Sequence, residues 1–111
     1  MRACLILRLK IEKAQAKGIK KEDIIIDPGI GFGKTREDNF EIIRRIEEFY
    51  GLGCEVMLGV SRKSLLNMPD ADNDLKDIFT VALNTLAVEN KVDYIRIHNV
   101  KLHKQLISIL K

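Results

Sequence analysis

Residues 24–34 read IIIDPGIGFGK, and this stretch decides the fold. The three isoleucines Ile24–Ile26 favour a short buried strand, since the apolar run is too short for a helix. Asp27 stands where that strand ends, and Pro28 has no N–H to donate, so strand pairing is expected to stop there. Every second residue from Gly29 onward is a glycine, which lets the backbone approach a bound group closely. An acidic residue at the carboxyl end of a strand, beside a glycine loop, is typical of ligand sites in α/β folds.

Two familiar phosphate-binding loops do not fit this stretch. The P-loop needs four residues between its first glycine and the Gly-Lys pair, and the segment from Gly29 to Gly33 has one residue too few. The dinucleotide fingerprint fails as well, because Lys34 stands where its third glycine is required. A purely structural turn, with an acid that caps a helix, is the alternative interpretation of the same residues.

Length and composition limit the classes of protein. A chain of 111 residues is expected to form a single domain over 1–111, and 46% hydrophobic residues is ordinary for a globular protein. The net charge of +3 comes from interspersed lysines and acids, which argues against a nucleic-acid surface. Cys4 and Cys54 fit no metal spacing and are expected to be reduced thiols. Arg8 and Lys10 interrupt the first apolar run, so neither a signal peptide nor a membrane span is predicted, and a cytoplasmic location follows.

Hydrophobic periodicity predicts alternating helices and strands along the whole chain. The expected order is a helix ending at Gly18, a strand at 24–26, a helix from a Thr35 cap to Gly51, a strand at 55–59, a helix from 75 to about 90, a strand at 94–98 and a last helix over 102–110. Strands that alternate with helices at this spacing indicate βα units with a parallel sheet.

Each predicted strand ends in polar or small residues that share one face. They are Asp27 after the first strand, Gly59, Ser61 and Lys63 after the second, and Arg96 and His98 in the third. Neighbouring parallel strands would bring these ends together at one edge of the sheet. An arginine and a histidine on one face of an otherwise apolar strand favour an anionic ligand.

The motifs DPGIGFGK, SRKS and RIHN, in this order, resemble the carboxyl-terminal half of dihydropteroate synthases. The resemblance covers essentially the whole chain and implies an α/β fold, a partial (β/α)8 TIM barrel of about three parallel strands and four helices. It also implies the family's reaction, the condensation of 6-hydroxymethyl-7,8-dihydropterin diphosphate with p-aminobenzoate to 7,8-dihydropteroate in folate biosynthesis. Sulfonamides inhibit this family.

The resemblance also implies roles for the residues that match its motifs. Pterin binding falls to Asp27, Gly59 and Lys63, p-aminobenzoate binding to Phe32 and Ser61, and diphosphate binding to Arg96 and His98, while Lys63, Arg96 and His98 are the expected catalytic residues. A carboxylate offers two acceptor oxygens to the N–H groups of a pterin, and a guanidinium matches phosphate oxygens.

The chain departs from the family pattern in three respects. Asn99 stands where the family usually has an aspartate after the histidine, which is expected to affect the protonation or orientation of His98. Residues 74–80 read DLKDIFT, without the family's usual arginine and glycine. A closed barrel needs about 250 residues, so this chain alone is expected to be inactive. Mg²⁺ is expected for the full-length enzyme, with its ligand outside this chain, and self-association into homodimers through the late helices is implied.

Two further interpretations remain open at the level of sequence. A pterin-binding domain of a methyltetrahydrofolate methyltransferase would also place acids at strand ends, but methyl transfer has no diphosphate for Arg96 and His98 to hold. A non-catalytic module that acts by protein interaction is the third possibility, because half of a barrel site is missing.

Overall fold

The computed structural model describes residues 1–30, 35–61 and 72–110. Its elements are α1 (Arg2–Ala16), the 3-10 helix η1 (Lys21–Asp23), β1 (Ile25–Ile26), α2 (Arg36–Arg44), the 3-10 helix η2 (Ile46–Leu52), β2 (Glu55–Leu58), α3 (Asn73–Glu89), β3 (Tyr94–Ile95) and α4 (Val100–Leu110). The predicted alternation of helices and strands is therefore confirmed.

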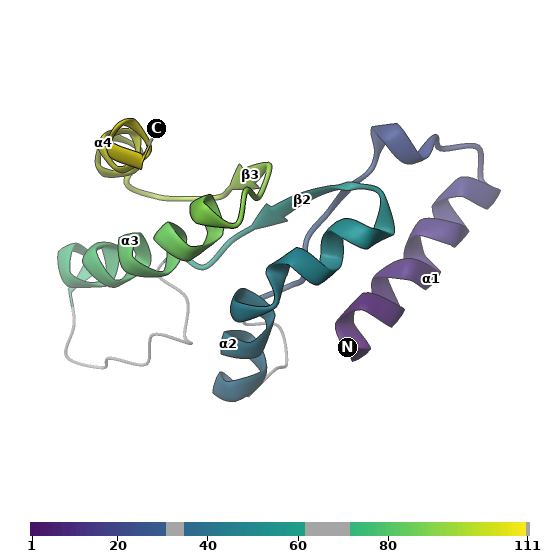
Figure 1. Ribbon diagram of the computed structural model, residues 1–111, viewed down its shortest axis with the longest axis horizontal. Helices are drawn as coiled ribbons and strands as arrows, with labels where there is room; N and C mark the ends of the chain where they lie inside the picture. Colours follow the sequence, from purple (N-terminus) through teal and green to yellow (C-terminus); the bar gives the residue numbers. More distant parts are fainter. Residues whose placement is uncertain (31–34, 62–71, 111) are drawn as a thin grey trace.

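The three strands form one parallel sheet in the order β1-β2-β3. Ile25 pairs with Glu55, and Met57 pairs with Tyr94. Figure 1 shows α1 lying beyond the β1 side of the molecule and α3 with α4 beyond its β3 side. Because the strands are parallel and neighbouring, their carboxyl ends all meet at one edge of the sheet.

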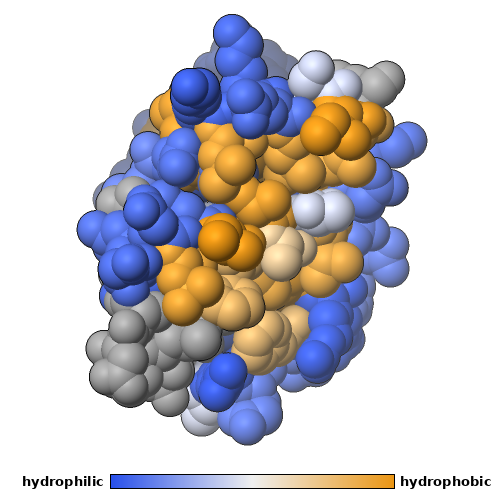
Figure 2. All heavy atoms as spheres, turned by 90° about the vertical axis from the view of Figure 1, so that its left-hand side faces the viewer, coloured by the Kyte–Doolittle hydropathy of each residue, from blue (hydrophilic) through white to orange (hydrophobic). Residues whose placement is uncertain are grey.

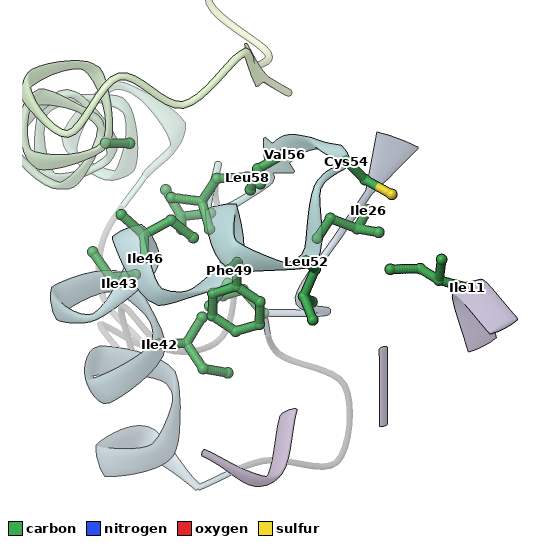
Figure 3. Packing of buried hydrophobic residues seen from close by; sticks show 13 residues of the cluster. Ile11, Ile26, Ile42, Ile43, Ile46, Phe49, Leu52, Cys54, Val56 and Leu58 are labelled. Carbon is green, nitrogen blue, oxygen red and sulfur yellow. The ribbon is translucent and has the colours of Figure 1, made fainter. Parts of the chain in front are cut away.

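One face of the sheet packs against helices and forms the core. Ile26, Val56 and Leu58 point into this core and are 4% exposed or less. They meet Ile46 and Phe49 of η2, and Figure 3 shows these side chains gathered between the strands and the helical segment. Burial of such large apolar side chains is the main force that holds the strands in place.

The opposite face of the sheet is exposed. Ile25 is 46% exposed and Tyr94 is 43% exposed, although both belong to strands. Parallel sheets are normally covered on both faces. In the described part of the chain one face of this sheet is therefore left uncovered, as it would be in a segment of a barrel.

The predicted helix from Thr35 to Gly51 is two helices, so that expectation is wrong. The capping box is confirmed, because Asp38 N–H donates to Thr35 Oγ1 at 3.1 Å and the Asp38 carboxylate accepts from Thr35 N–H. α2 then ends at Arg44, and Glu48 N–H donates to the Arg45 carbonyl at 3.0 Å, which is 3-10 geometry. The second helix, η2, is capped by Gly53, whose φ of 81° lies in the left-handed region that favours glycine.

The third strand is shorter than the predicted 94–98. Arg96 N–H still donates to the Leu58 carbonyl at 2.9 Å. His98 N–H donates instead to the Ser61 hydroxyl oxygen at 3.2 Å, so a side chain takes the place of the strand ladder there. Because this side-chain hydrogen bond replaces strand pairing, His98 lies on an irregular segment after β3, next to Ser61.

The hydrophobic stripe of α3 faces outward. Ile78 is 59% exposed and Leu86 is 45% exposed, whereas Asp77, Thr80 and Asn84 are buried. Figure 2 shows a broad hydrophobic surface on the side of the molecule where α3 and α4 lie. Among the described residues, no helix is long and apolar enough to span a bilayer.

Candidate functional site

The carboxyl ends of the three strands bring five of the predicted site residues to one edge of the sheet. Asp27 follows β1, Gly59 and Ser61 follow β2, and Arg96 and His98 follow β3. Side chains from opposite edges of the sheet touch, as the contacts below show. The convergence predicted from strand parity is therefore present in the structure.

Asp27 and Arg96 form an ion pair that spans the sheet. Nη2 of Arg96 lies 3.1 Å from Oδ2 of Asp27. The other carboxylate oxygen, Oδ1, accepts a hydrogen bond from Gly29 N–H at 2.8 Å. Gly29 has a φ of 76°, a conformation that a glycine adopts without strain. The side chains remain 32% and 58% exposed for Asp27 and Arg96, so both are accessible to a ligand.

Gly59 makes room for the Arg96 guanidinium. A Cβ atom at position 59 would lie 3.0 Å from Nη2 and 3.1 Å from Nε of Arg96. The absence of a side chain therefore lets the guanidinium cross β2 toward Asp27. Sequence reasoning assigned Gly59 to pterin binding, and the structure gives it this additional steric role.

Ser61 and His98 form the second contact across the strand ends. Ser61 Oγ lies 2.7 Å from Nδ1 of His98 and also accepts the His98 backbone N–H at 3.2 Å. Ser61 is buried and His98 is exposed. The hydroxyl thus fixes the imidazole through Nδ1.

Two predicted site residues, Phe32 and Lys63, lie outside the described residues. The apolar wall and the lysine that the resemblance implies therefore stay predictions. Arg96, another member of the expected cationic cluster, has its guanidinium on the sheet face that also carries Ile25 and Tyr94.

An acidic residue and a tyrosine lie on the same face, further from the strand ends. The negative charge of Glu55 raises the pKa of Tyr94 above its usual value of 10.0, and partial desolvation and a hydrogen bond to Glu55 act in the same direction. Tyr94 therefore stays neutral at physiological pH. It offers a hydroxyl rather than a charge to anything that covers this face.

Sequence reasoning missed a set of buried polar residues behind the site. Asn99 caps α4 by accepting Leu102 N–H at 3.0 Å, and its amide also donates to Asp77 at 3.3 Å. His103 and Asn84 are buried beside it and hydrogen-bonded to each other. The expected influence of Asn99 on His98 stays a prediction. The Asn99 side chain itself contacts Asp77 of α3 and Leu102 of α4. The available signal was a histidine four residues after Asn99, the spacing of one helical turn.

Taken together, the site combines a carboxylate acceptor with a guanidinium and an imidazole. The carboxylate suits N–H groups of a heterocycle, since it offers acceptors and no donors. The guanidinium suits oxyanions, with which it forms charge-assisted hydrogen bonds. Both functions occur within reach of each other on a single sheet edge.

Comparison with known proteins identifies one family. Residues 2–98 match the family described as pterin binding enzyme. The chain is 38% identical over 94 residues to a dihydropteroate synthase of Clostridium beijerinckii, with 81% of the chain and 34% of that relative covered. It is 37% identical over 87 residues to a probable bifunctional folylpolyglutamate synthase/dihydropteroate synthase of Haloferax volcanii, covering 78% of the chain and 10% of the relative.

Solved structures give the same result for the fold. Dihydropteroate synthase from Anaplasma phagocytophilum with bound 6-hydroxymethylpterin-monophosphate is 34% identical with a TM-score of 0.88, covering 97% of this chain and 42% of that one. The enzyme from Xanthomonas albilineans in complex with 7,8-dihydropteroate is 27% identical with a TM-score of 0.91, covering 98% and 42%. The chain thus spans less than half the length of these relatives, and its fold is that of a partial TIM barrel.

Proposed function

The chain belongs to the pterin binding enzyme family, and from that membership we propose that it is the carboxyl-terminal part of a dihydropteroate synthase. The full-length enzyme condenses 6-hydroxymethyl-7,8-dihydropterin diphosphate with p-aminobenzoate to 7,8-dihydropteroate in folate biosynthesis. In this proposal, residues 1–111 are a single domain that forms the carboxyl-terminal portion of its TIM barrel. The observation that carries the proposal is the meeting of Asp27 with Arg96, and of Ser61 with His98, at the carboxyl edge of the sheet.

Asp27 recognises the pterin. Its carboxylate is held by Gly29 N–H and stays partly exposed, so it is pre-oriented to accept hydrogen bonds from the amino and ring N–H groups of the heterocycle. Binding of a pterin requires Oδ2 to exchange the Arg96 contact for a ligand contact or to share it. Gly59 and Lys63 border the same subsite.

Arg96 and His98 hold the diphosphate and stabilise it as it leaves. Charge accumulates on the departing oxygens, and cationic donors that are already in place lower the energy of that state. Arg96 is 58% exposed on the sheet face, and His98 is fixed through Ser61. In the same proposal, Lys63 is the third member of this cationic group, and Phe32 and Ser61 belong to the p-aminobenzoate subsite.

Magnesium belongs to the full-length enzyme in this proposal. Asp27 directs one oxygen to a backbone N–H and the other to a guanidinium, an arrangement that does not fit a resident metal ligand. We therefore assign no step to the ion here. The remaining strands of the barrel complete the site, and the 111-residue chain is inactive without them.

A homodimer is the proposed assembly, and the cytoplasm is its proposed location. The support for the dimer is the hydrophobic surface of α3 and α4, where Ile78, Leu86 and Ile109 are 59%, 45% and 81% exposed. Exposed apolar side chains that gather on one surface often mark an interface.

Pterin binding tests the proposal directly. We expect 6-hydroxymethylpterin to bind the chain, as followed by its fluorescence, and Asp27→Asn to weaken that binding roughly tenfold, because one acceptor oxygen becomes a donor. Asp23→Asn, on the exposed 3-10 helix η1, is the matched control and is expected to bind like the wild type. Equal binding by both variants would remove Asp27 from the pterin site.

A further inference from the structure

A buried polar network links α3 to α4 directly behind His98. Asp77, Asn84 and His103 are each 2% exposed or less, and they are surrounded by helices rather than solvent. Buried polar groups are costly unless they are hydrogen-bonded. A cluster of three in so short a chain therefore calls for a physical reason.

Asn99 is the centre of the network and directly follows His98 in the sequence. Its carbonyl oxygen lies 2.8 Å from Nδ1 of His103. Its side-chain oxygen accepts Leu102 N–H at 3.0 Å, and its side-chain nitrogen donates to Asp77 Oδ2 at 3.3 Å. Both the side chain and the carbonyl of this residue are therefore held.

His103 and Asn84 complete the network. A carbonyl oxygen only accepts, so the short contact to Asn99 places a proton on Nδ1 of His103. Nε2 of the neutral ring is then an acceptor, and it lies 2.9 Å from Nδ2 of Asn84. The imidazole thus joins α3 to the backbone at residue 99 through its two ring nitrogens.

The backbone on the other side of this fixed point carries the anion site. His98 N–H and its imidazole both contact Ser61 Oγ, and Arg96 lies two residues earlier. We propose that Asp77, Asn84 and His103 are positioning residues, which act through Asn99 to hold His98 in place for an anionic ligand. This inference rests on the proposed diphosphate site, because positioning matters only if His98 has a ligand to meet.

A swap of the acid and the amide tests the central contact. Asn99→Asp alone places two carboxylates at the 3.3 Å contact, where they repel, although aspartate still caps a helix well. Asp77→Asn combined with Asn99→Asp restores a donor facing an acceptor. We expect the single variant to weaken diphosphate binding roughly tenfold by calorimetry, and the double variant to return to within roughly threefold of the wild type.

The ring ¹⁵N NMR signals of His98 report its hydrogen bonding directly. They would not change if the buried network only stabilised the fold. The chain has two histidines, so the signals of His98 and His103 are assigned by a single substitution. We expect Asn99→Asp to shift the His98 signals and the double variant to restore them. Thr85→Ala is the control, since its hydroxyl donates within α3 to the Val81 carbonyl. Unchanged His98 signals and unchanged affinity in Asn99→Asp would overturn the inference, even if that variant were less stable.

A second pair of variants covers the case in which Asn99→Asp does not fold. His103→Asn keeps an amide near the position of Nδ1, where it can still donate to Asn99, whereas His103→Gln keeps one near Nε2. We expect His103→Asn to bind diphosphate more tightly than His103→Gln by roughly threefold or more. Equal binding would overturn the inference. A wild type that does not bind diphosphate would contradict the proposed anion site, while the His98 signals would still test the positioning.

Discussion

Asp27 and Arg96 are 69 positions apart in the sequence, yet Nη2 of Arg96 lies 3.1 Å from Oδ2 of Asp27. The two residues directly follow β1 and β3, and the contact passes Gly59, which directly follows β2. It joins the residue proposed for the pterin to the residue proposed for the diphosphate. Binding of a pterin to Asp27, or of a diphosphate to Arg96, would therefore require this ion pair to break or to be shared with the ligand.

Removal of the guanidinium is expected to abolish diphosphate binding. Arg96→Ala takes away the exposed cation of this sheet edge, whereas Lys104→Ala removes a cation from α4 and is expected to leave binding unchanged. Added salt should weaken the wild-type interaction, because exposed charges are screened. Calorimetry with diphosphate measures both effects. Equal affinities of the two variants would contradict the assignment of Arg96.

Substitution of Gly59 tests the path of the guanidinium. Gly59→Ala places a methyl group 3.0 Å from Nη2 of Arg96, so the flexible end of that side chain has to move away from Asp27. We expect roughly tenfold weaker diphosphate binding with little change in the free energy of unfolding. Gly51→Ala is the matched control, since a Cβ there meets nothing within 4 Å. A Gly59→Ala variant with wild-type affinity would show that the position of Arg96 in the free protein is not the one that binds.

The parts of this structure that sequence predicted are those set by local pattern. The order of strands and helices follows from periodicity, and strand parity places Asp27, Ser61 and Arg96 on one edge. The hydrophobic stripe of α3 follows from the same periodicity, but a stripe alone does not tell what packs against it. The contact of Asn84 with His103 joins two helices, and no local pattern encodes it.

Ionisation of the tyrosines is expected to destabilise the fold at alkaline pH. Partial burial, followed by the charges of Asp93 and Glu47, raises the pKa of Tyr50 above its usual value of 10.0, and its hydroxyl donates to the Asn90 carbonyl. The unfolded chain therefore loses this proton first as the pH rises. The stability that Tyr50 contributes is complete below about pH 10 and is lost as the pH rises through the folded-state pKa.

Urea denaturation at about pH 8 and about pH 11 measures this loss. We expect the free energy of unfolding to fall between the two values in the wild type and to fall less in Tyr50→Phe, which has no proton to lose. Tyr94 has a raised pKa as well, so some alkaline loss is expected to remain in that variant. An identical loss in both proteins would contradict the role of Tyr50.

A charge on the outer face of α3 is expected to prevent self-association. Ile78 is 59% exposed on α3, which contributes to the hydrophobic surface described above, so Ile78→Glu places a charge where a second copy is proposed to pack. Leu9→Glu on α1 is the control, because Leu9 is 58% exposed but lies on a helix far from α3. Light scattering is expected to show a dimer for the wild type and Leu9→Glu and a monomer for Ile78→Glu. A dimer that only Leu9→Glu disrupts would move the interface to α1.

We expect catalysis to need more of the barrel than three strands provide. The sheet leaves Ile25 and Tyr94 exposed on the face that a complete barrel would enclose, so water reaches the reacting groups from that side. We expect the purified chain to form no dihydropteroate from both substrates and Mg²⁺.

Addition of the amino-terminal part of the Clostridium beijerinckii relative is expected to restore measurable turnover, provided that the two pieces dock. Arg96→Ala in the same mixture should lose at least roughly a hundredfold of that turnover, as expected when a preorganised electrostatic group is removed, while Lys104→Ala should keep it. Turnover by the 111-residue chain alone would show that the described sheet edge is already a sufficient active site.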